Sequence, residues 1–563
     1  MKTSPSFLLL VFLALPLQAQ NNNSLKDSYE GFKQEALKEY ADFRQQCNLE
    51  YAEFMKQAWA EYGAKPPVAI PEEKRVPMQV FNPQEKTTGS LATELEIEVV
   101  EEPFIPMDIV QPVPLCRIPE ARPADLSQVS LDIDLNIGEE ALQKLLPRMK
   151  VKKQKDKMRF YKKKEKKGAE KEVQVAKETE AAIPEELLTE DVEPVFKDLT
   201  FTFFGTEMKV RVLDDYKFTL SGCDDETLSN AWKLLSTPRF NNTIRDCLEL
   251  RYDYNMCDWA YVEMLQTMAE TYLGKGTNEA VFFAAYIYCQ SGYKMRLARH
   301  KGQLLILVAS KHFMYGHSFF VIDGQEYFTL VKFDPSERAE VCNAAFKNES
   351  GLSLFIPRNV SLACDYGEAR TIKSTFYDAM SMTVRVNKNL MEFYEKYPVS
   401  EVQDNFMTRW TMYANSPLSK DVKEQIYPGL AKGLEGKSPV EGVEMLLHML
   451  QTGLEYAYDN DVWGQDRIFF AEETLFYPVC DCEDRAIFFS RLVRDFYHLK
   501  TLLVHFPGHL LAAVHFDEEV EGDFCMHNGE KYIFCDPTYR GAGMGRIYSQ
   551  YQNTKPTVIL LGE

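Results

Sequence analysis

The sequence predicts a multidomain α+β protein. Its 563 residues are too many for one hydrophobic core, because single domains usually hold about 100–200 residues. Hydrophobic residues make up 45% of the chain and aromatic residues 12%, which is enough to fill several cores. From about residue 186, segments with helical spacing and segments with strand-like alternation follow one another. We therefore expect a helical N-terminal arm and a linker, followed by two α+β units.

Charge and cysteine content narrow the class of protein. The formal net charge is -20, and an acidic chain of this kind argues against general binding of nucleic acid. Twelve cysteines are far too few for a scaffold held together by disulfides. Cys525 and Cys535 are a candidate pair across a predicted hairpin. We expect no cofactor and no metal ion.

The first residues have the pattern of a secretory signal. Lys2 precedes a short apolar run over residues 7–17, and a cleavage site follows Ala19. The run is too short to span a bilayer comfortably, and no later stretch reaches 18 apolar residues. We therefore expect residues 1–19 to be removed and the protein to be secreted or periplasmic, with no integral membrane segment.

Residues 29–62 carry an 11-residue repeat. The repeating positions are Tyr29, Tyr40, Tyr51 and Tyr62, with Phe32, Phe43 and Phe54 between them. Eleven residues in three turns is close to the natural period of an α-helix. The repeat predicts one long amphipathic helix over residues 22–64. Its aromatic stripe would either contact a partner helix or a second copy, or lie on the protein's own surface.

Residues 65–185 are expected to form a linker. Residues 66–123 contain eleven of the 27 prolines, and proline disfavours both helices and central strands. Residues 144–171 hold 14 lysines and arginines against three acidic residues. This basic run is either a solvated arm or a patch for an anionic surface or for acidic parts of the same chain.

The C-terminal segment, residues 456–563, places three reactive side chains on successive elements. Cys482 precedes the amphipathic run that starts at Ala486, so it is expected at a helix N-terminus, where the helix dipole favours a thiolate. His509 opens a predicted strand after the turn Pro507-Gly508. Asp536 follows another predicted strand, 531–535, which the next proline ends. A nucleophile, a base and an orienting acid in this order are what acyl transfer through a thioester requires.

These residues resemble the transglutaminase-like superfamily, especially its bacterial cysteine-peptidase-like members. The matching residues are Glu472-Glu473-Thr474-Leu475, Asp481-Cys482-Glu483-Asp484-Arg485-Ala486, Phe489, Leu492, Arg494, Gly508-His509 and Asp536-Pro537-Thr538. The resemblance covers residues 455–545. It implies a papain-like fold with Cys482 as nucleophile, His509 as base and acid, and Asp536 as the orienting group. One departure is Cys480, where the family often has a glycine.

The implied activity is hydrolysis of peptide or isopeptide bonds in a protein or peptide substrate. Two alternatives remain open: amine transfer onto glutamine side chains, which uses the same thioester, and an exported scaffold that binds proteins without catalysis. A metal site at Cys480 and Cys482 is disfavoured, because no second cysteine pair has zinc-finger spacing. The side chains that could stabilise an oxyanion are Trp463, Gln465 and Tyr477.

A second unit of the same type is expected at residues 186–380, before a helical connector at 381–455. Asn278–Phe283 parallels Asp484–Phe489, and Gly302-Gln303 parallels Gly508-His509. Phe333-Asp334-Pro335 would then match Cys535-Asp536-Pro537. Gly276 would replace the nucleophile and Gln303 the base, or, in another register, Gly316-His317 would occupy the base position. Either register predicts an inactive copy; the alternative is a chance similarity between two α+β segments.

Overall fold

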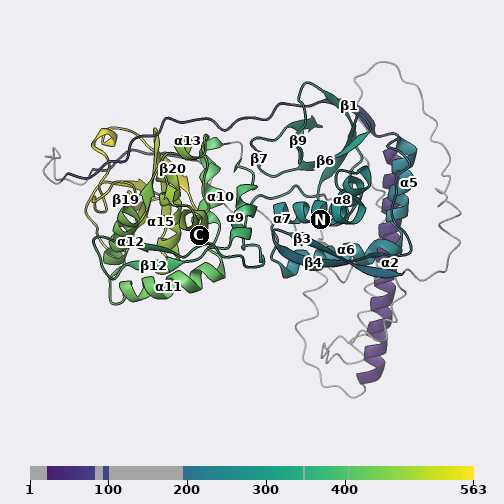
Figure 1. The fold of residues 1–563 in the computed structure, drawn as a ribbon, viewed down its shortest axis with the longest axis horizontal. Helices are drawn as coiled ribbons and strands as arrows, with labels where there is room; N and C mark the ends of the chain where they lie inside the picture. Colours follow the sequence, from purple (N-terminus) through teal and green to yellow (C-terminus); the bar gives the residue numbers. More distant parts are fainter. Residues whose placement is uncertain (1–21, 83–92, 101–194, 347–348, 403–404, 563) are drawn as a thin grey trace.

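A computed structural model describes residues 22–82, 93–100, 195–346, 349–402 and 405–562. The chain forms two units of mixed α and β structure that lie side by side (Figure 1). Each unit contains a six-stranded sheet. The predicted signal segment 1–19 and the basic run 144–171 lie outside the described residues. Within the described part of the chain, no helix combines the length and the apolar character that crossing a bilayer would demand.

Helix α2 (Asn22–Met55) is shorter than the repeat predicts. The expected helix over 22–64 is wrong at its C-terminal end, because Trp59–Gly63 forms strand β1 at the edge of the first sheet. Pairing with a neighbouring strand overrides the helical period there. The aromatic stripe is buried only near the C-terminal end of the helix: Tyr51 is 1% exposed, whereas Phe43 is 60% exposed. The N-terminal half of α2 extends away from the first unit (Figure 1).

The first unit packs helices on an antiparallel sheet. Its strand order is β1-β10-β5-β6-β9-β8, with bounds Arg338–Cys342 (β10), Met295–His300 (β5), Gln303–Ala309 (β6), Gln325–Thr329 (β9) and Phe319–Ile322 (β8). Helix α8 (Asn278–Gln290) contacts β5 and β6, and α7 (Asp258–Leu273) packs on α8. The remaining elements are the hairpin β3 (Phe196–Phe203) and β4 (Thr206–Leu213), α5 (Asp225–Leu235), which contacts α2, and α6 (Asn241–Asp253).

The segment between the two sheets is mainly helical, as expected for the connector. Its helices are α9 (Lys388–Glu395), α10 (Arg409–Asn415), α11 (Lys420–Leu434) and α12 (Pro439–Gly453). Short strands also occur: β11 (Arg370–Lys373) pairs with β12 (Ser381–Val384), and β7 (Phe313–Met314) pairs with β13 (Ser400–Glu401).

The second unit has a buried central helix, α15 (Cys482–Tyr497), between the sheet and helices α10, α12 and α14 (Ala471–Phe476). The sheet order is β18-β19-β17-β16-β20-β2, with bounds Phe524–His527, Glu530–Cys535, His509–His515, Thr501–Phe506, Thr557–Leu560 and Glu98–Val99. Strands β14 (Glu455–Tyr456) and β15 (Val479–Cys480) pair just before α15, and α13 (Asp459–Val462) lies between them in sequence. The expected pair Cys525 and Cys535 is not a disulfide: both thiols are free, and Cys525 lies opposite Tyr532.

The two units share one order of elements. A central helix is followed by an antiparallel strand pair, α8-β5-β6 in the first unit and α15-β16-β17 in the second. The sheet orders β10-β5-β6-β9-β8 and β20-β16-β17-β19-β18 then correspond strand for strand. The edge strands differ, because β1 runs antiparallel to β10 and β2 runs parallel to β20.

The proline-rich segment after β1 is extended, as expected, but it does not simply link domains. Lys65 donates a backbone hydrogen bond to Phe319 in the first unit at 2.7 Å, and Val76 donates one to Gly508 in the second at 2.9 Å. The segment continues to Phe81, whose N–H donates to Arg540 at 2.9 Å. Residues 64–82 thus cross from one unit to the other along one edge of the molecule (Figure 1). We call this segment the strap.

Candidate functional site

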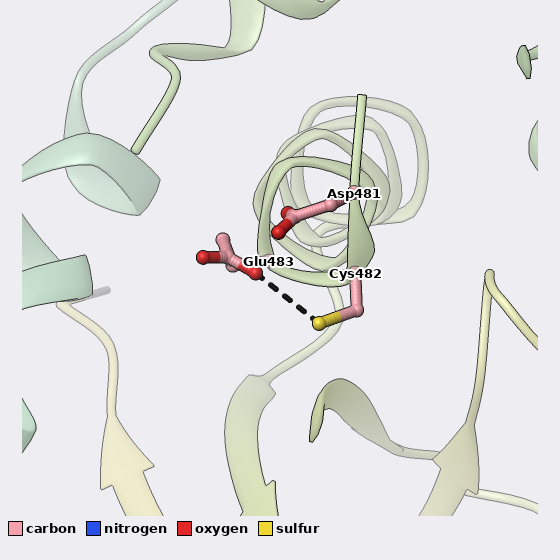
Figure 2. A group of neighbouring side chains, drawn as sticks. All are labelled: Asp481, Cys482 and Glu483. Atoms are coloured by element: carbon pink, nitrogen blue, oxygen red, sulfur yellow. Dashed lines mark hydrogen bonds between the residues drawn. The ribbon is translucent and has the colours of Figure 1, made fainter. Parts of the chain in front are cut away.

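The structure places Cys482 at the first residue of α15, as the sequence predicts. Its side chain is fully buried, and so are those of Asp481 and Glu483. The thiol donates a hydrogen bond to Glu483 Oε2 at 3.1 Å (Figure 2). The helix therefore begins with a buried thiol between two buried carboxyl groups.

His509 and Asp536 form a buried hydrogen-bonded pair. His509 Nε2 lies 2.8 Å from Asp536 Oδ2, and both side chains are about 1% exposed. The other oxygen, Oδ1, accepts hydrogen bonds from the backbone N–H groups of Thr538 (2.8 Å) and Tyr539 (3.1 Å). The ring of His509 also stacks on Tyr548, with centroids 4.8 Å apart and planes 16° apart. These contacts fix the orientation of the imidazole.

The thiol and the imidazole come from adjoining elements, since α15 packs against β17. The backbone N–H of Leu510, the residue after His509, acts on the Cys482 thiol and lowers its pKa. His509 Nδ1, however, is buried without a hydrogen-bond partner among the described residues. Among the described residues, no hydrogen bond therefore joins the thiol to the imidazole, and the thiol bonds to Glu483 instead.

Electrostatics in this arrangement favour the protonated thiol. Burial raises the pKa of Cys482 well above its usual value, and the charges of Glu483 and Asp481 raise it further. The Arg75 guanidinium and the Leu510 N–H act in the opposite direction but do not outweigh these effects. A charge that neutralised the two carboxylates more completely would make the thiolate easier to form.

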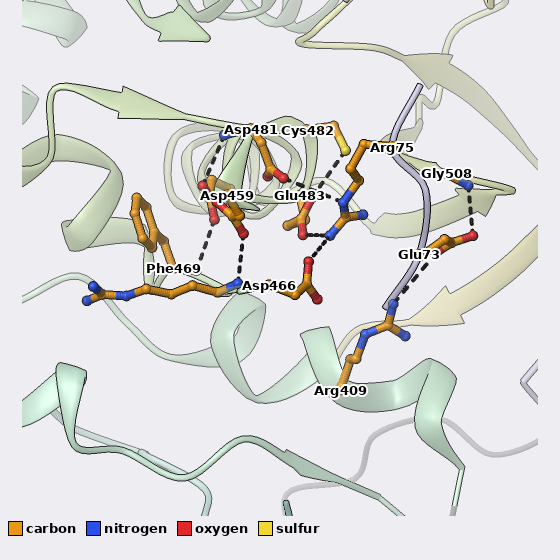
Figure 3. Close-up of polar contacts among 12 residues, drawn as sticks. Glu73, Arg75, Arg409, Asp459, Asp466, Phe469, Asp481, Cys482, Glu483 and Gly508 are labelled. Atoms are coloured by element: carbon orange, nitrogen blue, oxygen red, sulfur yellow. Dashed lines mark hydrogen bonds and ion pairs between the residues drawn. The ribbon is translucent and has the colours of Figure 1, made fainter. Parts of the chain in front are cut away.

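Arg75, from the strap, is inserted into a cluster of acidic side chains (Figure 3). Its Nη2 lies 2.6 Å from Asp466 Oδ1 and also pairs with Glu483, and its Nε lies 3.6 Å from Asp481 Oδ2. The Arg75 side chain is only 8% exposed. Its guanidinium thus places a positive charge against the carboxylates next to Cys482.

Glu73 attaches the same segment to the turn before His509. Its carboxylate accepts hydrogen bonds from the Gly508 N–H (2.7 Å) and from His505 Nε2 (2.9 Å). Burial alone would raise the pKa of Glu73, but the hydrogen bond and charge of His505, the Gly508 N–H and the Arg75 charge lower it to about 2. The strap therefore contacts both sides of the candidate site.

Three groups of side chains in the described part of the chain have donor atoms close enough to hold a metal ion. They are Asp481, Cys482 and Glu483; Asp459, Asp481 and Asp484; and Asp459, Asp466 and Glu483, each with donor atoms within 4.8 Å of one another. Arg75 already pairs with at least one carboxylate of each group, through Asp466, Asp481 and Glu483. Asp484 is committed elsewhere, since it accepts hydrogen bonds from the backbone of Asp481 and Phe469.

The three side chains that the sequence offers for stabilising an oxyanion are Trp463, Gln465 and Tyr477, and their contacts in the structure are as follows. The Trp463 ring packs on Tyr477 at 4.9 Å, and the Tyr477 hydroxyl accepts a hydrogen bond from Arg467 at 3.0 Å. Gln465 is exposed. The Tyr456 hydroxyl is buried without a partner among the described residues, and burial and the charge of Cys482 raise the pKa of Tyr456.

Sequence reasoning missed Glu73, Arg75, Tyr456 and Tyr548. Arg75 and Glu483 are separated by 408 residues, so no local spacing could link them. Tyr456 lies before the first matching motif, and Tyr548 lies after the last one. Neither residue belongs to a motif of its own.

The first unit lacks the three chemical groups at the corresponding positions. Gln303 begins β6 as His509 begins β17, but it is exposed. In the same register Gly276 corresponds to Cys482 and lies before the start of α8. His317 lies outside β6, so the register through Gly316-His317 does not fit.

The predicted match of Asp334 with Asp536 is wrong. Leu307 pairs with Thr329 in the first sheet, and the corresponding Ala513 pairs with Phe534 in the second. Counting on from these pairs, the position of Asp536 is taken by Val331, which is 52% exposed. The loop after β9 differs in length from the loop after β19. The similar Asp-Pro sequences therefore do not lie at equivalent positions.

No family model, no curated protein and no solved structure matches this chain.

Proposed function

We propose that residues 456–563 form a transglutaminase-like cysteine enzyme that hydrolyses peptide or isopeptide bonds. The observation that carries the proposal is the buried His509–Asp536 pair beside Cys482 at the N-terminus of α15. Because Asp536 accepts a hydrogen bond from Nε2, the neutral imidazole keeps its lone pair on Nδ1. A free Nδ1 is the group that a general base needs.

Each residue then has one task. After a rotation that frees it from Glu483, the thiol of Cys482 transfers its proton to His509 Nδ1, and the sulfur attacks the substrate carbonyl. His509 returns the proton to the leaving amine, and a thioester remains. Water, activated by His509, then attacks the thioester and releases the carboxylic acid and the free thiol. Asp536 orients the imidazole throughout, and the Tyr456 hydroxyl is our candidate donor to the oxyanion.

Amine transfer differs only in the second step, where a primary amine replaces water. The non-catalytic scaffold is the second candidate function, and one observation favours it: Cys482 is completely buried and bonded to Glu483, not to His509.

The first unit, with Gly276, Gln303 and Val331 at the three positions, is proposed to bind substrate or brace the second unit. Export to the periplasm or the exterior remains part of the proposal.

The test compares four forms of the full-length protein: wild type, Glu73→Gln, and each of these with Cys482→Ala. Release of peptides from a mixed protein substrate and incorporation of a biotinylated primary amine are measured in parallel. We expect Cys482-dependent peptide release, larger in the Glu73→Gln background, where the strap is held less firmly. Amine incorporation without peptide release would favour the transfer reaction.

Cys480→Ala is the matched control, because Cys480 is a buried thiol two residues away from Cys482. This variant should keep the activity. If neither background shows turnover that depends on Cys482, while all forms are folded by circular dichroism, the hydrolase proposal fails and the scaffold becomes the better description.

A further inference from the structure

We propose that the pocket formed by Asp466, Asp481 and Glu483 is a substrate subsite for a guanidinium-bearing side chain, and that residues 73–76 of the strap occupy it as an intramolecular substrate mimic. The inference rests on the proposed function for the reaction next to the pocket. The contacts of Arg75 define the pocket and the class of ligand that it takes.

The fit of the guanidinium is specific. Arg75 pairs with three carboxylates through Nη2 and Nε, at 2.6 Å for Asp466 and 3.6 Å for Asp481, with Glu483 also in direct contact. Asp481 and Glu483 are fully buried and Asp466 is 13% exposed. A planar fork of donors satisfies carboxylates on several sides, which the single ammonium of lysine cannot do equally well.

The backbone around Arg75 lies as an extended substrate would. The Val76 N–H donates to the carbonyl of Gly508 at 2.9 Å, directly before His509. Gly508 has φ +76°, and a Cβ at this position would come within 2.3 Å of the Lys74 carbonyl oxygen. Only glycine permits this close approach. The turn that carries the candidate base is therefore shaped to receive an extended chain.

The pocket requires a cation. Burial raises the pKa of Asp459 to about 8, with Glu483 as the next cause, and burial also raises the pKa of Asp466. Arg75 lowers both, and it favours the thiolate of Cys482. A substrate guanidinium that displaced Arg75 would supply the same charge in the same place, so this contribution in favour of the thiolate would be kept when the correct substrate is bound.

The hydrogen-bonding capacity of Arg75 in the pocket is only partly used. Arg75 Nη1 is buried without a hydrogen-bond partner among the described residues. An unpaired buried donor reduces the net gain from burying the group, so the strap is held less tightly than complete pairing would allow. An arginine-containing chain that also pairs Nη1 would compete with residues 73–76 for the pocket.

The binding test uses agmatine, which carries a guanidinium, and 1,5-diaminopentane, which carries only ammonium groups. In the full-length Arg75→Ala variant, isothermal titration should show agmatine binding at least tenfold tighter than the diamine. Wild type and Lys74→Ala, which removes an exposed cation from the same segment, should bind neither. Equal affinity for both ligands in Arg75→Ala, or no binding of agmatine, overturns the inference.

A second readout follows the reactivity of Cys482. In Arg75→Ala, agmatine should speed the alkylation of Cys482 by iodoacetamide, measured by peptide mapping, because a guanidinium in the pocket restores the charge that favours the thiolate; in Lys74→Ala, where Arg75 is present, agmatine should leave the rate unchanged. If Arg75→Ala does not fold, Glu73→Gln replaces it: millimolar agmatine should then increase hydrogen exchange of residues 73–76, and no increase overturns the inference.

The Arg75→Ala/Cys482→Ala double variant separates the two proposals. Agmatine binding by this variant, with no Cys482-dependent turnover in any form, would leave the subsite and refute the enzyme. Turnover that shows no preference for arginine over lysine in the substrate would leave the enzyme and refute the subsite.

Discussion

Glu73→Gln tests how firmly the strap is attached, whatever the site does. The substitution keeps the size of the side chain and one acceptor oxygen, but it removes the negative charge that faces His505, Gly508 and Arg75. The strap should therefore separate from the second unit more often, while both sheets remain folded. Glu72→Gln is the matched control, since Glu72 is the exposed neighbouring residue.

The size of the effect follows from the pKa of Glu73. A fall from 4.5 to about 2 corresponds to about 3.4 kcal/mol at neutral pH. The side chain is 30% exposed, and solvent screening reduces this ceiling. We expect about 1.5–2 kcal/mol, or about a 10- to 30-fold increase in the population with the strap released.

Because the folded pKa is depressed, this contribution is fully present above about pH 4.5 and is lost as the pH falls through about 2. Hydrogen exchange of the Val76 amide, which is bonded to Gly508, measures the release directly. Its protection at pH 7 should fall by the stated factor in Glu73→Gln and not in Glu72→Gln. The same protection in all three proteins would refute the reasoning.

Three further outcomes are expected. Asp536→Asn should lower any Cys482-dependent turnover by about 10³–10⁴-fold while leaving the melting temperature within a few degrees, because the amide no longer holds the productive tautomer of His509; unchanged turnover would exclude the assigned role. Arg485→Ala should cost about 1.5–3 kcal/mol in urea unfolding, because the fully buried guanidinium donates to the Leu454 carbonyl at 2.9 Å; a cost below about 0.5 kcal/mol would contradict this. Burial raises the pKa of Glu472 to about 7, so the contribution of its protonated form to stability is present below about pH 4.5 and is lost as the pH rises through 7. Glu472→Gln should therefore stabilise the protein at pH 8 but not at pH 5. Equal effects on stability at both pH values would contradict the shift.

Local patterns predicted those elements whose side chains and backbone depend on near neighbours. The strand that opens at His509 and the helix that begins near Cys482 occur as expected, because alternation, helical spacing and a glycine turn act within a few residues. The prediction of a helix that continues beyond Met55 was wrong, because Trp59–Gly63 pairs with β10 through hydrogen bonds that the repeat cannot reveal. The match of Asp334 was wrong because strand register, not sequence similarity, decides which residue follows the strand.

The candidate site shows the same limit in its chemistry. A helix N-terminus favours a thiolate by about 0.3–2 kcal/mol, or at most about 1.5 pKa units, and this local effect was the reason to expect an activated Cys482. In the structure, burial and the carboxylates of Glu483 and Asp481 outweigh it, and the pKa of the thiol is raised instead. Arg75, which opposes them without outweighing them, lies 408 residues before its partner Glu483. Burial and the neighbouring carboxylates, more than the helix N-terminus, therefore set the protonation of Cys482, and a cation among those carboxylates acts against them.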